Sequence, residues 1–186
     1  MVAKNMPLEF KTELTHTLRE YNDVFAWSCE DMQGLDQQFY QHKINLCPNT
    51  VSDRQRRYRL NPNYVARVKE DIDKVLWVGF IWPVKWATWI SSIVVVLKKH
   101  YKLRGCLNYH KLNEAKINNK FPLPFTDRVL DTMARHEIYT FLNGFSGYHQ
   151  IRMTEEDQEK MPFVREWGVF VVVVMMFSLK TAPATF

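Results

Sequence analysis

The chain has little cysteine, glycine or proline, and each shortage excludes a class of protein. Three cysteines are present, an odd number, and no two of them share a CxxC or CxxxC spacing. This pattern argues against a disulfide framework and against a zinc knuckle, so we interpret the cysteines as reduced thiols. Six glycines and eight prolines among 186 residues are too few for a low-complexity linker or a collagen-like repeat.

Long apolar runs are also missing from the sequence. The longest strongly apolar stretches, 93–97 and 169–177, fall well short of the roughly 20 residues that span a bilayer. The first ten residues include Lys4 and Glu9 and no continuous apolar segment, so a cleaved secretory signal is not expected. We therefore expect an intracellular protein, cytoplasmic or nuclear, with no membrane partner.

The chain does contain enough apolar material for one core of domain size. Hydrophobic residues make up 46% of it and aromatic residues 14%, which excludes a disordered chain. The formal net charge of +5 hints at polyanion binding. A charge of this size is also common in proteins that bind no polyanion, so its distribution matters more than its sum.

Helical periodicity marks two segments in the first half of the chain. The first predicts an amphipathic helix from apolar residues at helical spacing: Leu14, Leu18, Tyr21 and Phe25. An irregular connector follows, up to about residue 53. The second helix begins at Asn61 and Pro62, a capping residue followed by proline, and ends at Gly79.

Extended segments dominate the rest of the sequence. The runs 93–97 and 103–109 flank a polar turn and predict an antiparallel hairpin with a basic tip. Residues 137–142 predict a strand, and residues 162–174 predict a hairpin that turns at Trp167-Gly168. Two short helices are expected to begin at Thr126 and at Thr154, the latter with Asp157 as its capping-box partner. The sum predicts an α+β fold with a mainly antiparallel sheet.

One segment near the C-terminus carries a specific resemblance. Residues 141–151, Phe-Leu-Asn-Gly-Phe-Ser-Gly-Tyr-His-Gln-Ile, resemble the first catalytic motif of reverse transcriptases from gypsy-type long-terminal-repeat retrotransposons. Other blocks agree in order and spacing: 21–25, 97–99, 102–104, 112–113, 121–124, 166–168 and 176–186. A single block would be weak evidence for the resemblance, but this collinear series of blocks from about residue 8 to residue 186 is highly specific for it.

The resemblance implies a polymerase right-hand fold with fingers and an incomplete palm. It implies three regions: a connector between protease and polymerase (1–52), a fingers-like region (53–136) and the first part of the palm (137–186). In the family the partners are an RNA template, a DNA primer and a dNTP. Three aspartates hold two Mg²⁺ ions there, which activate the primer hydroxyl and stabilise the leaving pyrophosphate.

This sequence departs from the family at the metal ligands. Asn143 stands where the family has its first catalytic aspartate, and a neutral amide lacks the charge that holds a hard cation. The Tyr-x-Asp-Asp motif that supplies the other two does not occur in the sequence. We therefore expect that the chain does not bind Mg²⁺ and is catalytically inactive. The nearby acids are interpreted as solvated surface charges: Asp127, Asp131, Glu155, Glu156 and Asp157.

Further departures affect the backbone around the motifs. Asn108 and His110 replace an aspartate and an arginine of the family pattern. Met176 and Ser178 replace a proline and a glycine, which we expect to distort backbone contacts to an incoming nucleotide. The valine run 171–174 predicts an aggregation-prone strand.

Nucleotide-binding positions are better preserved. By the resemblance, Lys98 and Arg104 contact the triphosphate from the fingers, where a point cation and a planar fork suit phosphate oxygens. Tyr148 matches the aromatic residue that packs under the sugar and excludes a 2′-hydroxyl. The alternatives are a solvated hairpin tip for the two cations and a place in the core for Tyr148.

An arginine-rich segment is a second candidate for binding. Four arginines surround Tyr58 just before the second helix: Arg54, Arg56, Arg57 and Arg59. Basic side chains next to an aromatic ring suit single-stranded nucleic acid. A basic connector with no ligand is about equally consistent with the pattern. The tryptophans Trp77, Trp82, Trp86 and Trp89 are interpreted as core and surface packing.

The sequence therefore predicts a fragment of a reverse transcriptase that is inactive by itself. The alternatives are a nucleic-acid-binding remnant without catalysis and an unfolded vestige without function. An unrelated α+β enzyme has little support, because the sequence shows no glycine-rich phosphate loop, HExxH pattern or GxSxG elbow.

Overall fold

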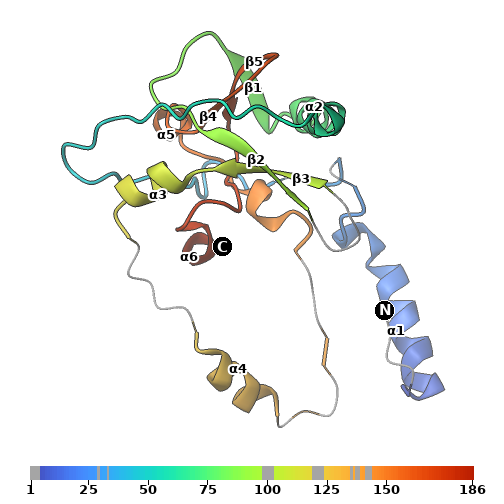
Figure 1. The fold of residues 1–186 in the computed structure, drawn as a ribbon. Helices are drawn as coiled ribbons and strands as arrows, with labels where there is room; N and C mark the ends of the chain where they lie inside the picture. The colour runs from blue at the N-terminus through green and yellow to red at the C-terminus, as the bar shows by residue number, and fades with distance from the viewer. Residues whose placement is uncertain are drawn as a thin grey trace. The chain divides into compact units, whose positions relative to one another are not determined.

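The structure is a computed structural model of the chain. It describes residues 5–28, 30–32, 34–97, 103–118, 124–134, 136, 139–140 and 144–186. The chain divides into two compact units, Met1–Gln33 and Gly34–Phe186. Figure 1 shows the order of the helices and strands along the chain.

The first unit contains the predicted N-terminal helix. Helix α1 covers Leu8–Glu20, which confirms the periodicity of Leu14 and Leu18. The helix ends before Phe25, because a tight 3₁₀ turn, η1, covers Asn22–Val24 and redirects the chain. No residue of α1 is buried. The apolar stripe of this helix is therefore not covered by the described residues.

The second unit contains two antiparallel sheets. Strands β1 (Ile81–Val84), β5 (Gly168–Val172) and β4 (Pro162–Arg165) form a three-stranded sheet in the order β1-β5-β4. Strands β2 (Ser92–Leu97) and β3 (Leu103–Asn108) form a separate hairpin. These ladders confirm the two predicted hairpins and the α+β class. Pro83 lies on the edge strand β1, where a residue without an N–H costs no ladder bond inside the sheet.

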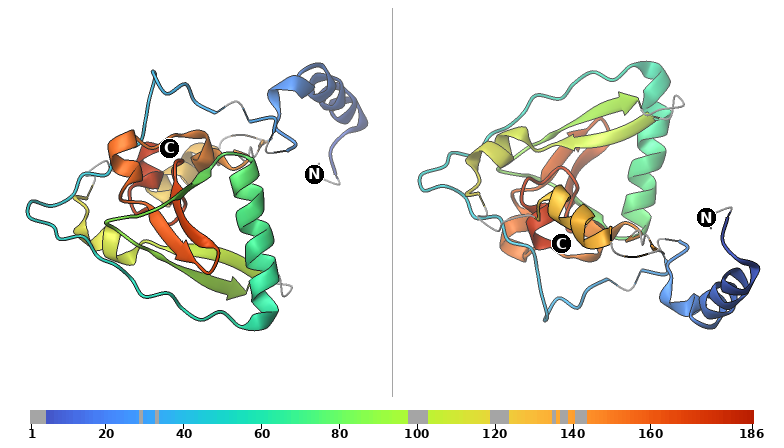
Figure 2. Two further views of the ribbon diagram at one scale, coloured as in Figure 1. Left: turned by 90° about the horizontal axis from the view of Figure 1, so that it is seen from above. Right: turned by 90° about the horizontal axis from the view of Figure 1, so that it is seen from below.

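Helix α2 (Pro62–Trp77) is built as its sequence predicts. The Asn61 side chain accepts a hydrogen bond from the Asn63 amide, and proline occupies the first turn. Gly79 follows with a φ of 76°, a left-handed conformation that favours glycine. Val68 and Ile72 are buried on the face that packs against β3 and β1. In both views of Figure 2, α2 runs along one side of the strands of this unit.

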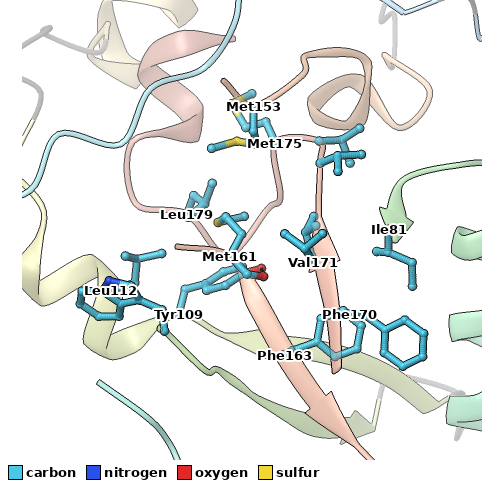
Figure 3. Close-up of a cluster of buried hydrophobic side chains, with 14 of the residues drawn as sticks. Ile81, Tyr109, Leu112, Met153, Met161, Phe163, Phe170, Val171, Met175 and Leu179 are labelled. Atoms are coloured by element: carbon cyan, nitrogen blue, oxygen red, sulfur yellow. Dashed lines mark hydrogen bonds between the residues drawn. The ribbon is translucent and has the colours of Figure 1, made fainter. Parts of the chain in front are cut away.

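The core lies between the two sheets and the chain that follows β5. Phe163 and Phe170 stack with their ring centroids 5.5 Å apart (Figure 3). Tyr109 is 1% exposed, and its hydroxyl donates to the Met161 carbonyl at 3.1 Å. A bridge between Ser91 and Phe163 connects the hairpin to the three-stranded sheet. One continuous core therefore holds the two sheets together.

The valine run 171–174 is buried in this core. Val172 pairs with β1, Val171 also pairs with β4, and the Val173 amide donates to the Phe80 carbonyl. The central position of β5 explains why the run is apolar on both faces. In the folded chain these valines are covered on both sides of the strand.

The connector after residue 34 is more ordered than its irregular pattern indicates. The His42 amide donates to the Arg152 carbonyl, and the Thr154 amide donates to the His42 carbonyl. Further on, Leu46 forms an antiparallel bridge with Lys116. The segment therefore pairs with two parts of the chain that lie more than 65 residues away. Such pairings leave no local sequence signal.

Short helices complete the second unit. They are α3 (His110–Ala115), α4 (Thr126–Met133), η3 (Gly147–Gln150), α5 (Glu155–Gln158) and α6 (Ala182–Thr185). Thr126 was expected to cap α4, but it is the first helical residue and Phe125 takes the cap position. The predicted strand 137–142 lies outside the described residues apart from Tyr139 and Thr140, which are in no strand.

Asp157 corrects two sequence predictions. Thr154 does precede α5, but its side chain binds the Asp157 carboxylate instead of a helix amide, so no capping box forms. Asp157 is 6% exposed and therefore is not a solvated charge. Its carboxylate accepts the Ile44 amide at 2.8 Å and pairs with Lys160. The prediction failed because these partners come from the connector and from the turn after α5.

The four tryptophans divide as expected between core and surface. Trp89 is buried, whereas Trp77, Trp82 and Trp86 are exposed. None of the described helices is long and apolar enough to cross a membrane.

Candidate nucleotide-binding site

Arg104 projects from strand β3 toward an aromatic ring. It pairs with Val96 across the hairpin, and its side chain is exposed. Its guanidinium carbon lies 5.7 Å from the centroid of the Phe177 ring, within the range of a cation–π contact. This contact orients the guanidinium, and none of the described residues accepts a hydrogen bond from its N–H groups.

Tyr148, from a later segment of the chain, also contacts the Phe177 ring. It lies on η3 and is half-buried, with its ring centroid 4.5 Å from that of Phe177. A second aromatic, Phe186, lies edge-on to Tyr148 at 5.2 Å. The structure therefore brings Arg104 and Tyr148, 44 residues apart in sequence, around one phenylalanine. We call Arg104, Tyr148, Phe177 and Phe186 the aromatic cluster.

Two glycines make room for this cluster. A Cβ atom on Gly147 would lie 2.6 Å from the Phe186 ring, and one on Gly144 would lie 3.3 Å from it. Ser146, between them, has a φ of 45° and so turns the backbone through the left-handed region. The chain approaches the Phe186 ring so closely that a side chain at residue 147 has no space.

His149 packs against the aromatic cluster through Phe177 and against Phe80. Its ring lies 5.7 Å from Phe177 and 5.2 Å from Phe80. Burial lowers the pKa of His149, and the positive charge of Arg104 lowers it further, so the ring is neutral at pH 7. Its Nε2 is buried and has no hydrogen-bond partner among the described residues.

The loop that carries Phe177 is held by Asn113 of helix α3. The Asn113 amide donates to the Ser178 carbonyl at 2.8 Å, and its oxygen accepts the Lys180 amide at 2.9 Å. The Leu179 amide closes a turn onto the Met176 carbonyl. An ordered turn therefore forms here without the proline and glycine of the family pattern.

The predicted arginine segment lies along the hairpin edge. The Gln55 amide donates to the Ile90 carbonyl, and its side chain binds Ser92 and the Asn108 carbonyl. Beneath the segment, the buried Arg165 donates to the carbonyls of Tyr58 and Ile93. These bonds hold the backbone and leave the side chains exposed: Arg54, Arg56, Arg57, Tyr58 and Arg59. Of the four arginines, Arg54 also donates to the Ala87 carbonyl at 2.5 Å.

Sequence reasoning found Arg104 and Tyr148 but missed Phe177, Phe186 and His149. All three lie inside blocks that carry the resemblance, which was the available signal. Their contacts depend on tertiary packing, so the sequence did not distinguish them from core residues. Lys98 and Asn143 lie outside the described residues.

Comparison with known proteins identifies the family. The chain is 27% identical over its whole length to a retrovirus-related Pol polyprotein from Drosophila melanogaster transposon 412. It is 30% identical over 150 residues, 78% of the chain, to the corresponding polyprotein of transposon 297. A Schizosaccharomyces pombe Tf2-3 transposon polyprotein is 29% identical over 94% of the chain. No family model matches the chain.

Solved structures agree on the fold. The chain superposes on prototype foamy virus protease-reverse transcriptase with a TM-score of 0.81 over 98% of its length, at 20% identity. Related foamy virus structures in complex with RNA/DNA hybrid and with double-stranded DNA give TM-scores of 0.75 and 0.71. The chain is similar in sequence to part of retroelement Pol polyproteins and has the fold of a reverse transcriptase. It spans 13–15% of the length of these curated relatives and 24% of the foamy virus chain.

Reverse transcriptases generally use a divalent metal, and the described residues of this chain do not fit one. The described residues contain no group of three histidine, cysteine, aspartate or glutamate side chains that could hold an ion. The buried carboxylate nearest in sequence to the motif, Asp157, is already bound by the Ile44 amide, Thr154 and Lys160. Residue 143, where the family pattern has an aspartate, is an asparagine, whose neutral amide lacks the charge that holds a hard cation.

Proposed function

We propose that this chain forms the fingers and the nucleotide-facing part of the palm of an RNA-directed DNA polymerase. By itself it binds nucleotide or nucleic acid and does not polymerise. The observation that carries this proposal is the aromatic cluster, in which Arg104 and Tyr148 meet around Phe177. The associated regional assignment is a connector at 1–52, fingers at 53–136 and palm from 137.

Each side chain of the cluster has a definite part in binding. The Arg104 fork suits phosphate oxygens, and the ring beneath it limits its motion. Tyr148 offers a flat apolar face to a sugar and is supported by Phe177 and Phe186. Lys98, which follows β2 in the sequence, would add a second cation. Mg²⁺, the ion the family pattern implies, enters no step here because the described residues do not fit it.

The arginine segment extends the proposed interface to a strand of nucleic acid. Its exposed cations line a backbone that Gln55 and Arg165 hold in place. Neutralising phosphates there would release counterions and make binding weaken with salt. Foamy virus relatives are known in complex with RNA/DNA hybrid and double-stranded DNA, which favours a nucleic-acid partner. As a retroelement product, the protein is placed by this proposal in the cytoplasm or the nucleus.

Replacing Arg104 by alanine tests the cluster. We expect the affinity for an RNA/DNA hybrid to fall about three- to tenfold. The slope of log affinity against log salt concentration should become shallower by roughly the amount that one phosphate contact contributes. Fluorescence anisotropy over a salt series would measure both. Arg67→Ala is a matched control, because Arg67 is an exposed arginine of α2 that pairs with Glu70 and Asp71.

Two outcomes would overturn the proposed function. One is hybrid binding that does not weaken as salt rises or that is unchanged in Arg104→Ala. The other is primer extension by the isolated chain, which would show that the missing aspartates are not required.

The competing possibility is a remnant that folds without a partner or does not fold. Hydrogen exchange separates the alternatives. Protection of β5 amides, which pair on both sides, is expected for a folded palm. Protection of residues 137–142 would place the predicted motif strand beside it, and a lack of protection in both segments would mean that no palm forms.

A further inference from the structure

A polar cavity of about 690 Å³ lies in the second unit, and it shares no lining residue with the aromatic cluster. Its walls are the connector residues 37–43 and Asn45, the segment 116–118 after α3, and Thr181 and Thr185 around α6. The described residues that line it include Lys43 and Lys116 but no aspartate or glutamate. The volume lies in the usual range of small-molecule sites. The cavity therefore combines positive charge with enough room for a ligand.

Lys116 is the buried charge of this cavity. It is 5% exposed, and among the described residues the partners of its ammonium group are neutral: the Thr181 hydroxyl and His42 Nε2, the latter at 3.2 Å. An ammonium group has no acceptor, so Nε2 must accept here. The proton of His42 then lies on Nδ1, which donates to the Thr185 hydroxyl at 2.9 Å. Thr181 and His42, the latter held by Thr185, fix the position of the Lys116 ammonium group.

The nearby carboxylate does not neutralise this charge. Asp157 accepts its hydrogen bonds from Lys160, Thr154 and the Ile44 amide. Burial lowers the pKa of Lys116 to about 8, although Asp157 acts in the opposite direction. Burial also lowers the pKa of His42 to about 4, so this ring is neutral at pH 7. A buried ammonium group without a carboxylate partner is stabilised by an anion that enters the cavity.

Aromatic and amide side chains line the other part of the cavity. The Phe39 ring is 80% exposed and that of Tyr40 is 42% exposed, so both present unused flat faces. Three glutamines and two asparagines lie beside them: Gln37, Gln38, Gln41, Asn45 and Asn118. Aromatic faces stack on bases, and amides pair with their edges. If the phosphate of a nucleotide binds Lys116, the base of that nucleotide would lie within the same cavity.

We propose that this cavity binds a nucleoside monophosphate group, free or at the end of a strand. Lys116 and the Thr181 hydroxyl hold the phosphate, and Phe39, the more exposed of the two aromatic residues, stacks on the base. Because the cavity shares no residue with the aromatic cluster, this site does not depend on the function proposed above.

Calorimetric titration of the full chain with AMP tests the site. Lys116→Met is expected to weaken AMP binding at least tenfold, whereas Lys74→Met, which removes an exposed charge from α2, leaves it unchanged. Phe39→Ala changes an exposed residue, so it is not expected to affect folding. It should weaken AMP binding but not the weaker binding of inorganic phosphate. Arg104→Ala is expected to leave the Lys116-dependent binding intact, which separates this site from the aromatic cluster.

The pH dependence provides a second measurement. AMP affinity is expected to be highest near pH 7, because the phosphate gains its second negative charge around pH 6, and to fall above pH 8 as Lys116 loses its proton. The charged groups around Lys116 are Lys43, Asp157 and Lys160, with His42 remaining neutral in this range. The fall above pH 8 should be absent in Lys116→Met.

The source of the phosphate follows from a comparison of ligands. A 5′-phosphorylated oligonucleotide that binds through Lys116 more tightly than AMP indicates a strand end, and the reverse order indicates a free nucleotide. The proposal is overturned if AMP does not bind, or if Lys116→Met binds it as well as the unchanged chain.

Discussion

Asp157→Ala is expected to lower the free energy of unfolding by about 3 kcal/mol, the largest stability effect we predict. The carboxylate is buried and joins three segments through the Ile44 amide, the Thr154 hydroxyl and Lys160. Its removal leaves the Ile44 amide without its acceptor and the partly buried ammonium group of Lys160 without its counter-charge, although Lys160 also donates to the Ile44 carbonyl. Denaturant unfolding monitored by circular dichroism would measure the change. Glu156→Ala, an exposed neighbour, should change stability by less than about 0.5 kcal/mol.

The same carboxylate contributes to an acid sensitivity with two steps. Burial would raise the pKa of Asp157, but hydrogen bonds from Lys160, Thr154 and Ile44 lower it below its ordinary value of 3.8. Its stabilising contribution is therefore present above pH 3.8 and is lost as the pH falls through the lower folded pKa. The lowered pKa values of His42 and His149 add an earlier loss below about pH 6.5, because the unfolded chain binds those protons first, and for His42 this loss extends to about pH 4.

Asp157→Ala should keep the His42 step and lose the lower one. Equal losses of stability in Asp157→Ala and Glu156→Ala would contradict the assignment of this carboxylate as a buried anchor. An unchanged acid profile below pH 4 in Asp157→Ala would contradict it as well.

Gly147→Val is expected to reduce hybrid or nucleotide binding at the aromatic cluster at least tenfold. A Cβ atom at this position would lie 2.6 Å from the Phe186 ring, far inside van der Waals contact. The ring must move, and Tyr148, whose ring contacts Phe186, would lose that support. Anisotropy measurements with the labelled hybrid would report the loss.

Gly144→Ala is the graded control for this change. Its Cβ atom would lie 3.3 Å from the same ring, so a shift of a few tenths of an ångström accommodates it. We expect a loss of no more than about twofold, with both variants giving the circular dichroism spectrum of the unchanged chain. If both bind alike, or if Gly147→Val binds normally while folded, Phe186 does not support the site.

Local signals explain which parts of the fold were predictable. Helix α2 begins at an asparagine cap with proline and ends at a left-handed glycine, and these are properties of a few adjacent residues. The hairpin of β2 and β3 follows from two apolar runs around a polar turn. Both predictions were confirmed because the interactions that decide them act over a few residues.

The site was predictable only in part. Arg104 and Tyr148 came from motif blocks, but their meeting around Phe177 requires β3, η3 and the loop after β5 to pack together. Asp157 was misassigned because its acid-rich surroundings indicate a surface, whereas the Ile44 amide that binds its carboxylate belongs to a segment far away in the sequence. Whether a polar residue is buried and hydrogen-bonded depends on partners from other segments, and the hydrophobic pattern of the sequence does not reveal those partners.

By itself the sequence determined the α+β class, the bounds of α2, the two hairpins and the resemblance to reverse transcriptases, with asparagine at residue 143. Only the tertiary structure decided that the connector pairs with residues 152–154 and 115–117, and that Lys116 is buried against His42 and Thr181. The physical reason is the range of the interactions. Helix caps and the alternation of apolar and polar residues in strands are set by neighbouring residues. Burial and charge compensation depend on segments that meet only when the chain has folded.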